Sequence, residues 1–411
     1  MKYTVEAVLA SGGRLGKLSQ TSTAGTIAME TPMCTLFTKG GSAPHLSAVM
    51  LQRISQVPEV ACMSLGSIAS HHENVREFGK GLGEFSAMKD KVIFTTLHDA
   101  TAAVASGKND KGGVAVWGKG GKMKLDPQLY MKVQEAFRPD WFQALSDGDT
   151  DKTCGKKRLS KAVDRTLDFL DDIVEMKNES EVLKTSSLIG AIEGGYSVEE
   201  RRRSAKETAA RPVDGFLIEG FEKGHSSVDL FADEEFMTVL TETMVHLPDD
   251  KPRMMDAVWS PLQVIRAFRL GIDVFSSAYP HTLTEKGFAL TADYSLPPTS
   301  QPAKLELEGS KENSASSGFY VDLNDKRFFE SFSPILPGCG CYTCANFTCS
   351  YLHHLLNTSE LLAYVLLTIH NFEQYFKFFA RLRETGRQDK LSELEQSLAR
   401  QEGGQREDVV R

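Results

Sequence analysis

The chain of 411 residues lacks several features that would place it in other classes of protein. It has no run of about 18 apolar residues, so no transmembrane helix is expected. Its first residues contain no apolar stretch of the kind that directs secretion, so no signal peptide is expected. Positive charge is not in excess, because 47 Lys and Arg face 55 Asp and Glu, a net charge of −8. This balance disfavours a protein that coats nucleic acid without specificity, but it is compatible with a local basic face.

Cysteine is also scarce and is unevenly placed. The chain has seven cysteines, an odd number that argues against a disulfide framework in a protein without a secretory signal. Reduced thiols are therefore expected. Four of them, Cys339, Cys341, Cys344 and Cys349, fall within eleven residues. A cluster this tight predicts a metal site rather than scattered core thiols.

Short apolar segments alternate with helical segments over residues 1–296. The alternation is typical of parallel βαβ units, and eight such units predict an α/β fold of the TIM (β/α)8 barrel type. A doubly wound sheet is the alternative. Helices are predicted at 127–137, 161–174, 198–210 and 261–270. The eight predicted strands are Met33–Thr38, Ala61–Leu65, Val92–Leu97, Trp141–Leu145, Ser187–Ile192, Gly215–Ile218, Arg253–Val258 and Ile272–Phe275.

Several segments add to this predicted barrel of residues 1–296. Glycine-rich patterns predict a β-hairpin inserted near 111–123 and another at 13–29 that closes the lower end of the barrel. Residues 297–318 are polar and are expected to form a flexible loop. A zinc-binding subdomain with a long final helix is expected over 319–385, followed by a charged tail at 386–411.

The strongest local signal is the C-x-C-x2-C segment made by Cys339, Cys341 and Cys344. Three thiolates at this spacing can surround one tetrahedral ion, and zinc suits three sulfur ligands with one further nitrogen or sulfur. A closed site of this kind predicts one structural Zn²⁺. Spacing leaves the fourth ligand open. The candidates are Cys349, His353, His354 and His370, and a set of buried free thiols is the alternative.

The cysteine segment resembles that of the tRNA-guanine transglycosylase family, the queuine tRNA-ribosyltransferases. That family carries a histidine 26 positions after the last cysteine, followed by a long helix, and here this position is His370. Other similar segments are Gly190–Gly195, Gly215–Gly220 and Gly271–Phe275. The resemblance implies a barrel with a zinc subdomain and selects His370 as the fourth ligand. It also implies exchange of a tRNA anticodon guanine through a covalent ribosyl-aspartate.

The chain departs from the family pattern at the expected pocket. Ser276 stands where the family has its nucleophilic aspartate, and a serine cannot replace that carboxylate without activation. The motif of the second catalytic aspartate is absent, and Asp99 is the nearby carboxylate. Asp147 falls near the position that recognises the base. Glu193 and Glu219 replace a glutamine and a glycine. These changes predict a degenerate pocket without catalytic residues.

That pattern resembles the accessory, non-catalytic subunits of eukaryotic members of the family. Segments Gly41–Leu46, Val116–Gly118, Pro139–Gln143 and His370–Phe376 support it. The resemblance implies a heterodimer with a catalytic paralogue, or a homodimer when alone. It implies tRNA as substrate, with queuine replacing guanine at the anticodon wobble position. It further implies a cytoplasmic location with peripheral contact to the mitochondrial outer membrane. The alternative is an active base-exchange glycosyltransferase that uses Asp99 or Asp147.

Two basic clusters are candidate tRNA contacts, because an RNA-binding face needs cations to neutralise phosphates. Solvated helix faces are the alternative. The aromatic residues of the final helix are spread too widely for one apolar stripe, so core and partner contacts are both considered for them. The basic residues are Lys156, Lys157, Arg158, Lys161, Arg201, Arg202 and Arg203, and the aromatic residues are Phe372, Tyr375, Phe376, Phe378 and Phe379.

Overall fold

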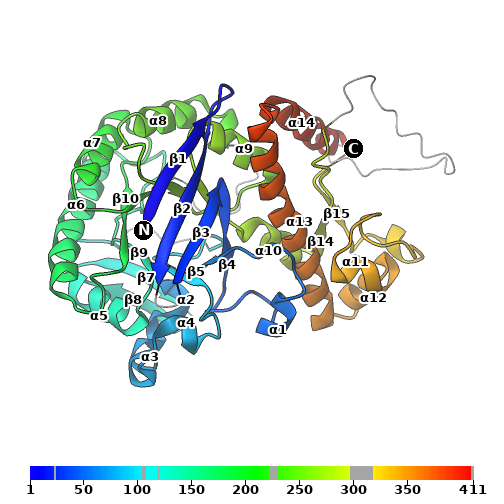
Figure 1. Ribbon diagram of the computed structural model, residues 1–411, viewed down its shortest axis with the longest axis horizontal. Helices are drawn as coiled ribbons and strands as arrows, with labels where there is room; N and C mark the ends of the chain where they lie inside the picture. Colours follow the sequence, from blue (N-terminus) through cyan, green and yellow to red (C-terminus); the bar gives the residue numbers. More distant parts are fainter. Residues whose placement is uncertain (23–24, 103–107, 119, 222–229, 297–317, 409–411) are drawn as a thin grey trace.

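The computed structural model describes residues 1–22, 25–102, 108–118, 120–221, 230–296 and 318–408. Within these residues, eight parallel strands form a closed barrel in the order β10-β11-β12-β13-β4-β5-β6-β9 (Figure 1). The predicted α/β barrel is thus confirmed. The expected polar loop lies outside the described residues except for its last residue. The barrel strands are β4 (Met33–Phe37), β5 (Val60–Ser64), β6 (Val92–Thr96), β9 (Trp141–Gln143), β10 (Ser187–Ile192), β11 (Gly215–Ile218), β12 (Arg253–Met255) and β13 (Val274–Ser276).

The barrel strands are buried on both faces, which is why their sequences are almost continuously apolar. In β5, Val60 and Cys62 belong to the cluster inside the barrel, whereas Ala61 and Met63 belong to the larger core under the helices. The same alternation occurs in β6, as the two-residue period of a strand requires. Trp141 of β9 is the largest fully buried side chain and also faces the interior cluster.

The helices around the barrel start at recognisable capping residues. Asp126 accepts a hydrogen bond from the backbone N–H of Leu129 at the start of α5. Ser260 forms a reciprocal capping box with Gln263 at the start of α9. Helix α6 begins earlier than predicted, at Lys156. These helices are α5 (Pro127–Phe137), α6 (Lys156–Glu179), α7 (Val198–Ala209), α8 (Glu234–Met244), α9 (Pro261–Arg269) and α10 (Ala278–Glu285), with shorter helices α1 (Ala48–Leu51), α2 (Leu65–Ile68), α3 (His72–Phe78) and α4 (Gly81–Phe85).

A three-stranded antiparallel sheet covers the amino-terminal end of the barrel. It contains β1 (Lys2–Val8), β2 (Arg14–Ser22) and β3 (Gly25–Thr31), so the predicted hairpin is present and gains a further strand. Tyr3 packs into the interior cluster of the barrel. Arg14 forms a 2.6 Å ion pair with Asp273, which is fully buried just before β13. The sheet therefore plugs the barrel end, as expected.

The inserted hairpin consists of β7 (Val114–Gly118) and β8 (Gly121–Leu125), slightly later in the chain than predicted. It packs closely on α2. A Cβ atom at Gly118 would lie 2.4 Å from the carbonyl oxygen of Gly66, so glycine is needed for this approach. The hairpin forms one wall of the cavity described below.

The C-terminal subdomain packs on the barrel through its longest helix, α13 (Leu361–Arg387). The five aromatic residues considered above for partner contact are each at most 3% exposed and belong to the main core, so they are core residues and not partner contacts: Phe372, Tyr375, Phe376, Phe378 and Phe379. The helix is anchored further along by Arg387, which pairs with Glu30 of β3 at 2.5 Å. The other elements of this subdomain are β14 (Phe288–Leu290), β15 (Tyr320–Asp322), α11 (Tyr342–Asn346) and α12 (Cys349–Asn357).

The segment expected as a charged tail contains helix α14 (Leu391–Asp408). Its Leu391, Leu394 and Leu398 are fully buried in the main core, because their spacing places them on one helical face. The expectation of a tail is therefore wrong for this segment. Among the described residues, no helix combines the length and apolar character needed to cross a membrane.

Candidate metal centre and barrel pocket

Cys339, Cys341, Cys344 and His370 converge in the C-terminal subdomain. One ligand atom from each lies within 4.8 Å of the others. Cys341 caps helix α11, where its Sγ accepts a hydrogen bond from the backbone N–H of Cys344. The cap brings two of the sulfurs together across one helical turn. Three thiols and one imidazole in this arrangement can hold a metal ion.

The imidazole of His370 is oriented by the surrounding backbone. Its Nε2 donates to the carbonyl of Leu290 at 2.8 Å, which leaves Nδ1 facing the sulfurs of Cys344 and Cys341 at 3.3 and 3.5 Å. Gln374, one turn further along α13, donates from Nε2 to Cys339 Sγ at 3.0 Å. Such outer partners fix the ligands of metal sites. Sequence reasoning missed Gln374, although its spacing of four from His370 was a usable signal.

Hydrogen bonds among the clustered thiols shift their pKa values in opposite directions. Hydrogen bonds from the thiols of Cys341 and Cys344 lower the pKa of the Cys339 thiol below its usual range. Hydrogen bonding to Cys339 and Cys341 raises the pKa of the Cys344 thiol above its usual range. A bound cation would remove this competition, because it favours the thiolate form of all three ligands.

The other candidate ligands lie outside this cluster. Cys349 is buried in the small apolar core of the subdomain. His353 is also buried, with Nδ1 donating to the Leu323 carbonyl at 2.8 Å and Nε2 accepting from Asn357 at 2.8 Å. His354 is exposed on α12. The structure therefore brings together the set that the family resemblance selects.

Asp147 follows β9 at the carboxyl end of the barrel and is fully buried. Arg158 donates two hydrogen bonds to its carboxylate at 2.7 and 2.9 Å, and Arg165 donates one at 2.8 Å. Asn109 donates another at 3.0 Å. With these donors the carboxylate is held as an ion-paired structural group. Arg158 is correspondingly half-buried rather than free for RNA.

Glu193 and Glu219 follow β10 and β11 and lie next to Arg201 inside the protein. Glu219 accepts hydrogen bonds from Gln143 at 2.6 Å and Ser146 at 2.7 Å. Arg201 donates to two backbone carbonyls and its guanidinium lies over the ring of Phe221 at 4.0 Å. The expected pocket is thus occupied by buried, mutually paired polar groups.

Arg201 does not lie on the surface. Its side chain is fully buried, and burial lowers its pKa to about 10, although Glu193 opposes the shift. A buried guanidinium cannot reach a tRNA phosphate, so the prediction of Arg201 as an RNA contact is wrong. Arg202 is exposed but pairs with Glu242 at 2.7 Å. Arg203 is half-buried and pairs with acidic residues of α6 and α7.

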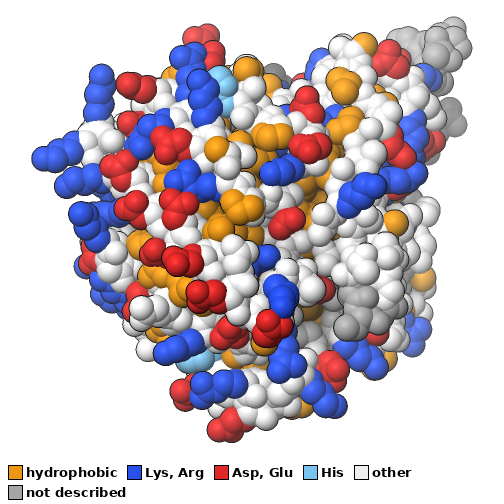
Figure 2. All heavy atoms as spheres, turned by 60° about the vertical axis from the view of Figure 1, so that its left-hand side comes forward, with side chains coloured by type: hydrophobic (Ala, Val, Ile, Leu, Met, Phe, Trp, Pro, Cys, Tyr) orange, Lys and Arg blue, Asp and Glu red, His pale blue; other side chains and the backbone are white. Residues whose placement is uncertain are grey.

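Three lysines of α6 remain as exposed cations. We refer to Lys156, Lys157 and Lys161 as the α6 lysine cluster. Figure 2 shows that the face formed by α6 and α7 carries basic and acidic side chains interspersed, rather than a uniform basic patch. Any RNA contact on this face would therefore involve a few cations.

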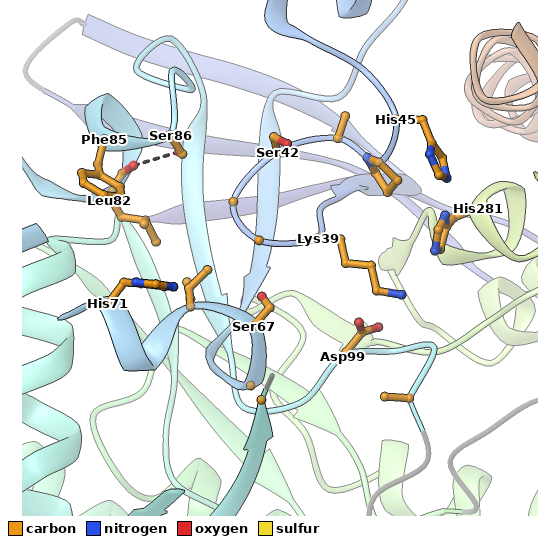
Figure 3. Close-up of a pocket in the computed structure, with 18 of the residues that line it drawn as sticks. Lys39, Ser42, His45, Ser67, His71, Leu82, Phe85, Ser86, Asp99 and His281 are labelled. Atoms are coloured by element: carbon orange, nitrogen blue, oxygen red, sulfur yellow. Dashed lines mark hydrogen bonds between the residues drawn. The ribbon is translucent and has the colours of Figure 1, made fainter. Parts of the chain in front are cut away.

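Ser276 ends strand β13 and is 1% exposed. Its hydroxyl has no hydrogen-bond partner among the described residues, so it is not activated by a neighbouring base. Asp99 lies elsewhere, after β6, in a cavity of about 680 Å³ at the barrel mouth. Its carboxylate accepts two hydrogen bonds from Thr101 at 2.7 and 2.8 Å. Asp99 and Lys39 point into this cavity near the rings of His45 and His281 (Figure 3).

The cavity also contains a group that sequence reasoning missed. His45, His281 and Glu285 place their ligand atoms within 4.8 Å of one another. His281 and Glu285 are four residues apart on α10, a spacing that puts both on one helical face. His45 lies about 240 residues away from these two in the chain. The pairing of β13 with β4, which closes the barrel, brings His45 close to α10.

Comparison with known proteins decides the family. A family model described as queuine tRNA-ribosyltransferase matches residues 10–403. The chain belongs to this family.

The similar proteins found include several named queuine tRNA-ribosyltransferase accessory subunit 2. The chain is 40% identical to that of Pongo abelii over 409 residues, which cover 95% of this chain and 97% of the relative. It is 39% identical to that of Homo sapiens over 419 residues, covering 98% and 100%. It is 32% identical to that of Aedes aegypti over 403 residues, covering 98% and 93%. The resemblance to accessory subunits is thereby confirmed along nearly the whole chain.

Proposed function

We propose that this chain is the non-catalytic subunit of a queuine tRNA-ribosyltransferase. It would pair with the catalytic subunit and support tRNA binding while guanine is exchanged for queuine at the wobble position. The observation that carries the proposal is the likeness, over almost its full length, to relatives named as accessory subunits. A homodimer is the expected state of the chain on its own.

The chemistry of the barrel mouth supports a non-catalytic role. Aspartate is the nucleophile that the family resemblance implies, and Ser276 occupies the corresponding place. Asp147, the carboxylate nearest the expected base site, is clamped by Arg158 and Arg165. An attacking carboxylate must reach the sugar carbon, and a fully buried, doubly paired one is poorly suited to that task. The alternative of an active enzyme using Asp99 or Asp147 is therefore not favoured.

Exposed apolar residues on the C-terminal subdomain support pairing with another protein. Phe329 and Phe332 are 68% and 77% exposed in the segment before the cysteines, and Leu361 is 75% exposed at the start of α13. Large exposed aromatic side chains are enriched at protein interfaces. We propose that these exposed residues of the subdomain contribute to the subunit interface. The aromatic face of α13 does not, because it is buried in the core.

We also propose that Cys339, Cys341, Cys344 and His370 hold one structural Zn²⁺. Three sulfurs and one nitrogen form a ligand set that suits tetrahedral zinc. With four protein ligands the site would be closed and non-catalytic, and the bound ion would stabilise the subdomain. His370 is already held with Nδ1 facing the sulfurs, so little rearrangement is required.

The proposed location is the cytoplasm, with peripheral contact to the mitochondrial outer membrane. This proposal rests on the family resemblance alone. Fractionation of cells, followed by carbonate extraction of the mitochondria, tests it. Recovery in the cytosol and in the carbonate-released fraction is expected, and resistance to extraction would contradict peripheral contact.

The decisive experiment for the function is a base-exchange assay with each subunit alone and with both together. Incorporation of labelled queuine into tRNA is expected from the pair and not from this chain alone. Co-purification measures pairing independently of activity. Exchange catalysed by the purified chain alone would refute the non-catalytic assignment and favour the enzyme alternative. The variant Asp147→Asn would then show whether that carboxylate is responsible.

A further inference from the structure

A second group of metal-binding side chains lies at the barrel mouth, away from the cysteine cluster. His45 comes from the loop after β4, and His281 and Glu285 come from α10 after β13. His45 Nε2 lies 2.6 Å from Glu285 Oε1, and His281 Nδ1 lies 3.8 Å from the same oxygen. The three groups border the cavity shown in Figure 3.

Both imidazole rings are held by aromatic neighbours. The ring of His281 stacks on Phe37 with centroids 5.1 Å apart and planes 26° apart. The ring of His45 stacks on Tyr364 at 5.4 Å and 28°. Rings packed in this way keep their ligand nitrogens within 4.8 Å of each other and of Glu285, which lowers the entropy lost when an ion binds.

The nitrogen of His281 provides an independent observation. The residue is 3% exposed, and its Nδ1 has no hydrogen-bond partner among the described residues. Buried polar atoms usually form a hydrogen bond, so one that lies 3.8 Å from Glu285 Oε1 without such a bond points to a missing ligand between the two groups. An ion bound to His281 would satisfy this atom and neutralise the negative charge of Glu285.

We propose that His45, His281 and Glu285 form a second metal site, for a divalent transition ion. Two imidazole nitrogens and one carboxylate oxygen suit Zn²⁺, Co²⁺ or Fe²⁺, and three protein ligands leave coordination positions open. The three side chains line the 680 Å³ cavity, which gives a small ligand access to them. The charge of Lys39 on the cavity wall opposes a cation, whereas that of Asp99 favours it. The site differs from the cysteine cluster in ligand type and in access.

Titration with Co²⁺ tests this proposal. The holoprotein, with its cysteine cluster saturated with Zn²⁺, is titrated with Co²⁺ and followed by visible absorption. One further equivalent is expected, with d–d bands and without the sulfur-to-cobalt charge-transfer band that thiolate ligands give. This signature separates the second site from the first, so the proposal stands or falls independently of the structural zinc.

Two conservative variants identify the ligands. His45→Asn is suitable because His45 has a positive φ of 59°, a conformation that asparagine tolerates. Glu285→Gln keeps the side-chain shape. Each variant is expected to weaken Co²⁺ binding at least tenfold. The melting temperature of the protein without Co²⁺ should not change, because the side chains of His45 and Glu285 are 25% and 50% exposed. His354→Asn, an exposed histidine outside both groups, is the control.

Two outcomes would overturn the proposal. In the first, the wild-type holoprotein takes up no further equivalent, and His45 and Glu285 then form a simple ion pair. In the second, both variants bind Co²⁺ as tightly as the wild type and the His354→Asn control, and the ion then binds elsewhere.

Discussion

Replacing Cys341 with serine is a direct test of the metal centre. The change removes one of three sulfurs and disturbs little else. Cys341 accepts the capping hydrogen bond at the start of α11, and serine is a favourable residue at that position. The helix should therefore still begin correctly. The measured loss would then report on metal binding rather than on local folding.

The expected effect is large because structural zinc contributes about 10–16 kcal/mol to the folding of small zinc domains. A whole domain is typically stable by about 5–15 kcal/mol. The small core of the subdomain, with Leu352 and Leu366 at its centre, is separate from the main core. Helix α13, in contrast, packs on the barrel along most of its length. We expect Cys341→Ser to lose near-stoichiometric zinc and to loosen residues 319–357, while the barrel stays folded.

Elemental analysis of the purified protein measures the zinc content, and amide hydrogen exchange locates the loosened segment. Cys349→Ser is the matched control, because Cys349 is 2% exposed in the same small core but lies outside the metal cluster. It should retain zinc. Near-stoichiometric zinc in Cys341→Ser would refute the ligand assignment, as would an equal loss of zinc from Cys349→Ser.

Three further predictions follow from burial and charge. Arg201→Ala should lower the free energy of unfolding in urea by about 3–5 kcal/mol, because it leaves buried carboxylates uncompensated. Arg202→Ala, on the surface, should lower the free energy of unfolding by about 1 kcal/mol or less, and equal effects of the two variants would contradict the burial of Arg201. Reversal of the α6 lysine cluster to glutamate should reduce crosslinking of tRNA to the proposed heterodimer, and it should reduce the salt dependence of tRNA binding. Unchanged binding would place the RNA elsewhere. Phe332→Asp should weaken pairing with the catalytic subunit at least tenfold in sedimentation experiments, whereas the equally exposed Val8→Asp should not, and matching affinities would exclude this surface from the interface.

The barrel is predictable from sequence because its strands are short, apolar on both faces and separated by helices with clear start signals. Asp126 before Pro127 marks the start of α5 at the correct residue. Strand β1 gives a weaker signal, since most of its side chains are exposed. Helix α14 was not predicted, because its many charged residues indicate a tail. The helical spacing of Leu391, Leu394 and Leu398 was the signal that it forms a packed helix.

The site is only partly predictable from sequence. Spacing identifies three metal ligands, and the family resemblance adds His370, which the fold brings to them. Three consecutive arginines, however, look alike in sequence, while successive residues of a helix point about 100° apart. Arg201 faces the interior and Arg202 faces solvent for that reason alone. The proximity of His45 and His281 at the barrel mouth arises from the pairing of β4 with β13, which are far apart in the chain. No local sequence pattern predicts it.

Helix α13 connects parts of the molecule that the sequence presents as separate modules. It carries His370 of the metal cluster, and Glu373, about one turn further along, accepts hydrogen bonds from Ser55 at 2.5 and 2.7 Å. Its last residue pairs with Glu30 in the amino-terminal sheet. A chimaera that exchanges the cysteine subdomain between two family members must therefore exchange this helix and its barrel partners with it.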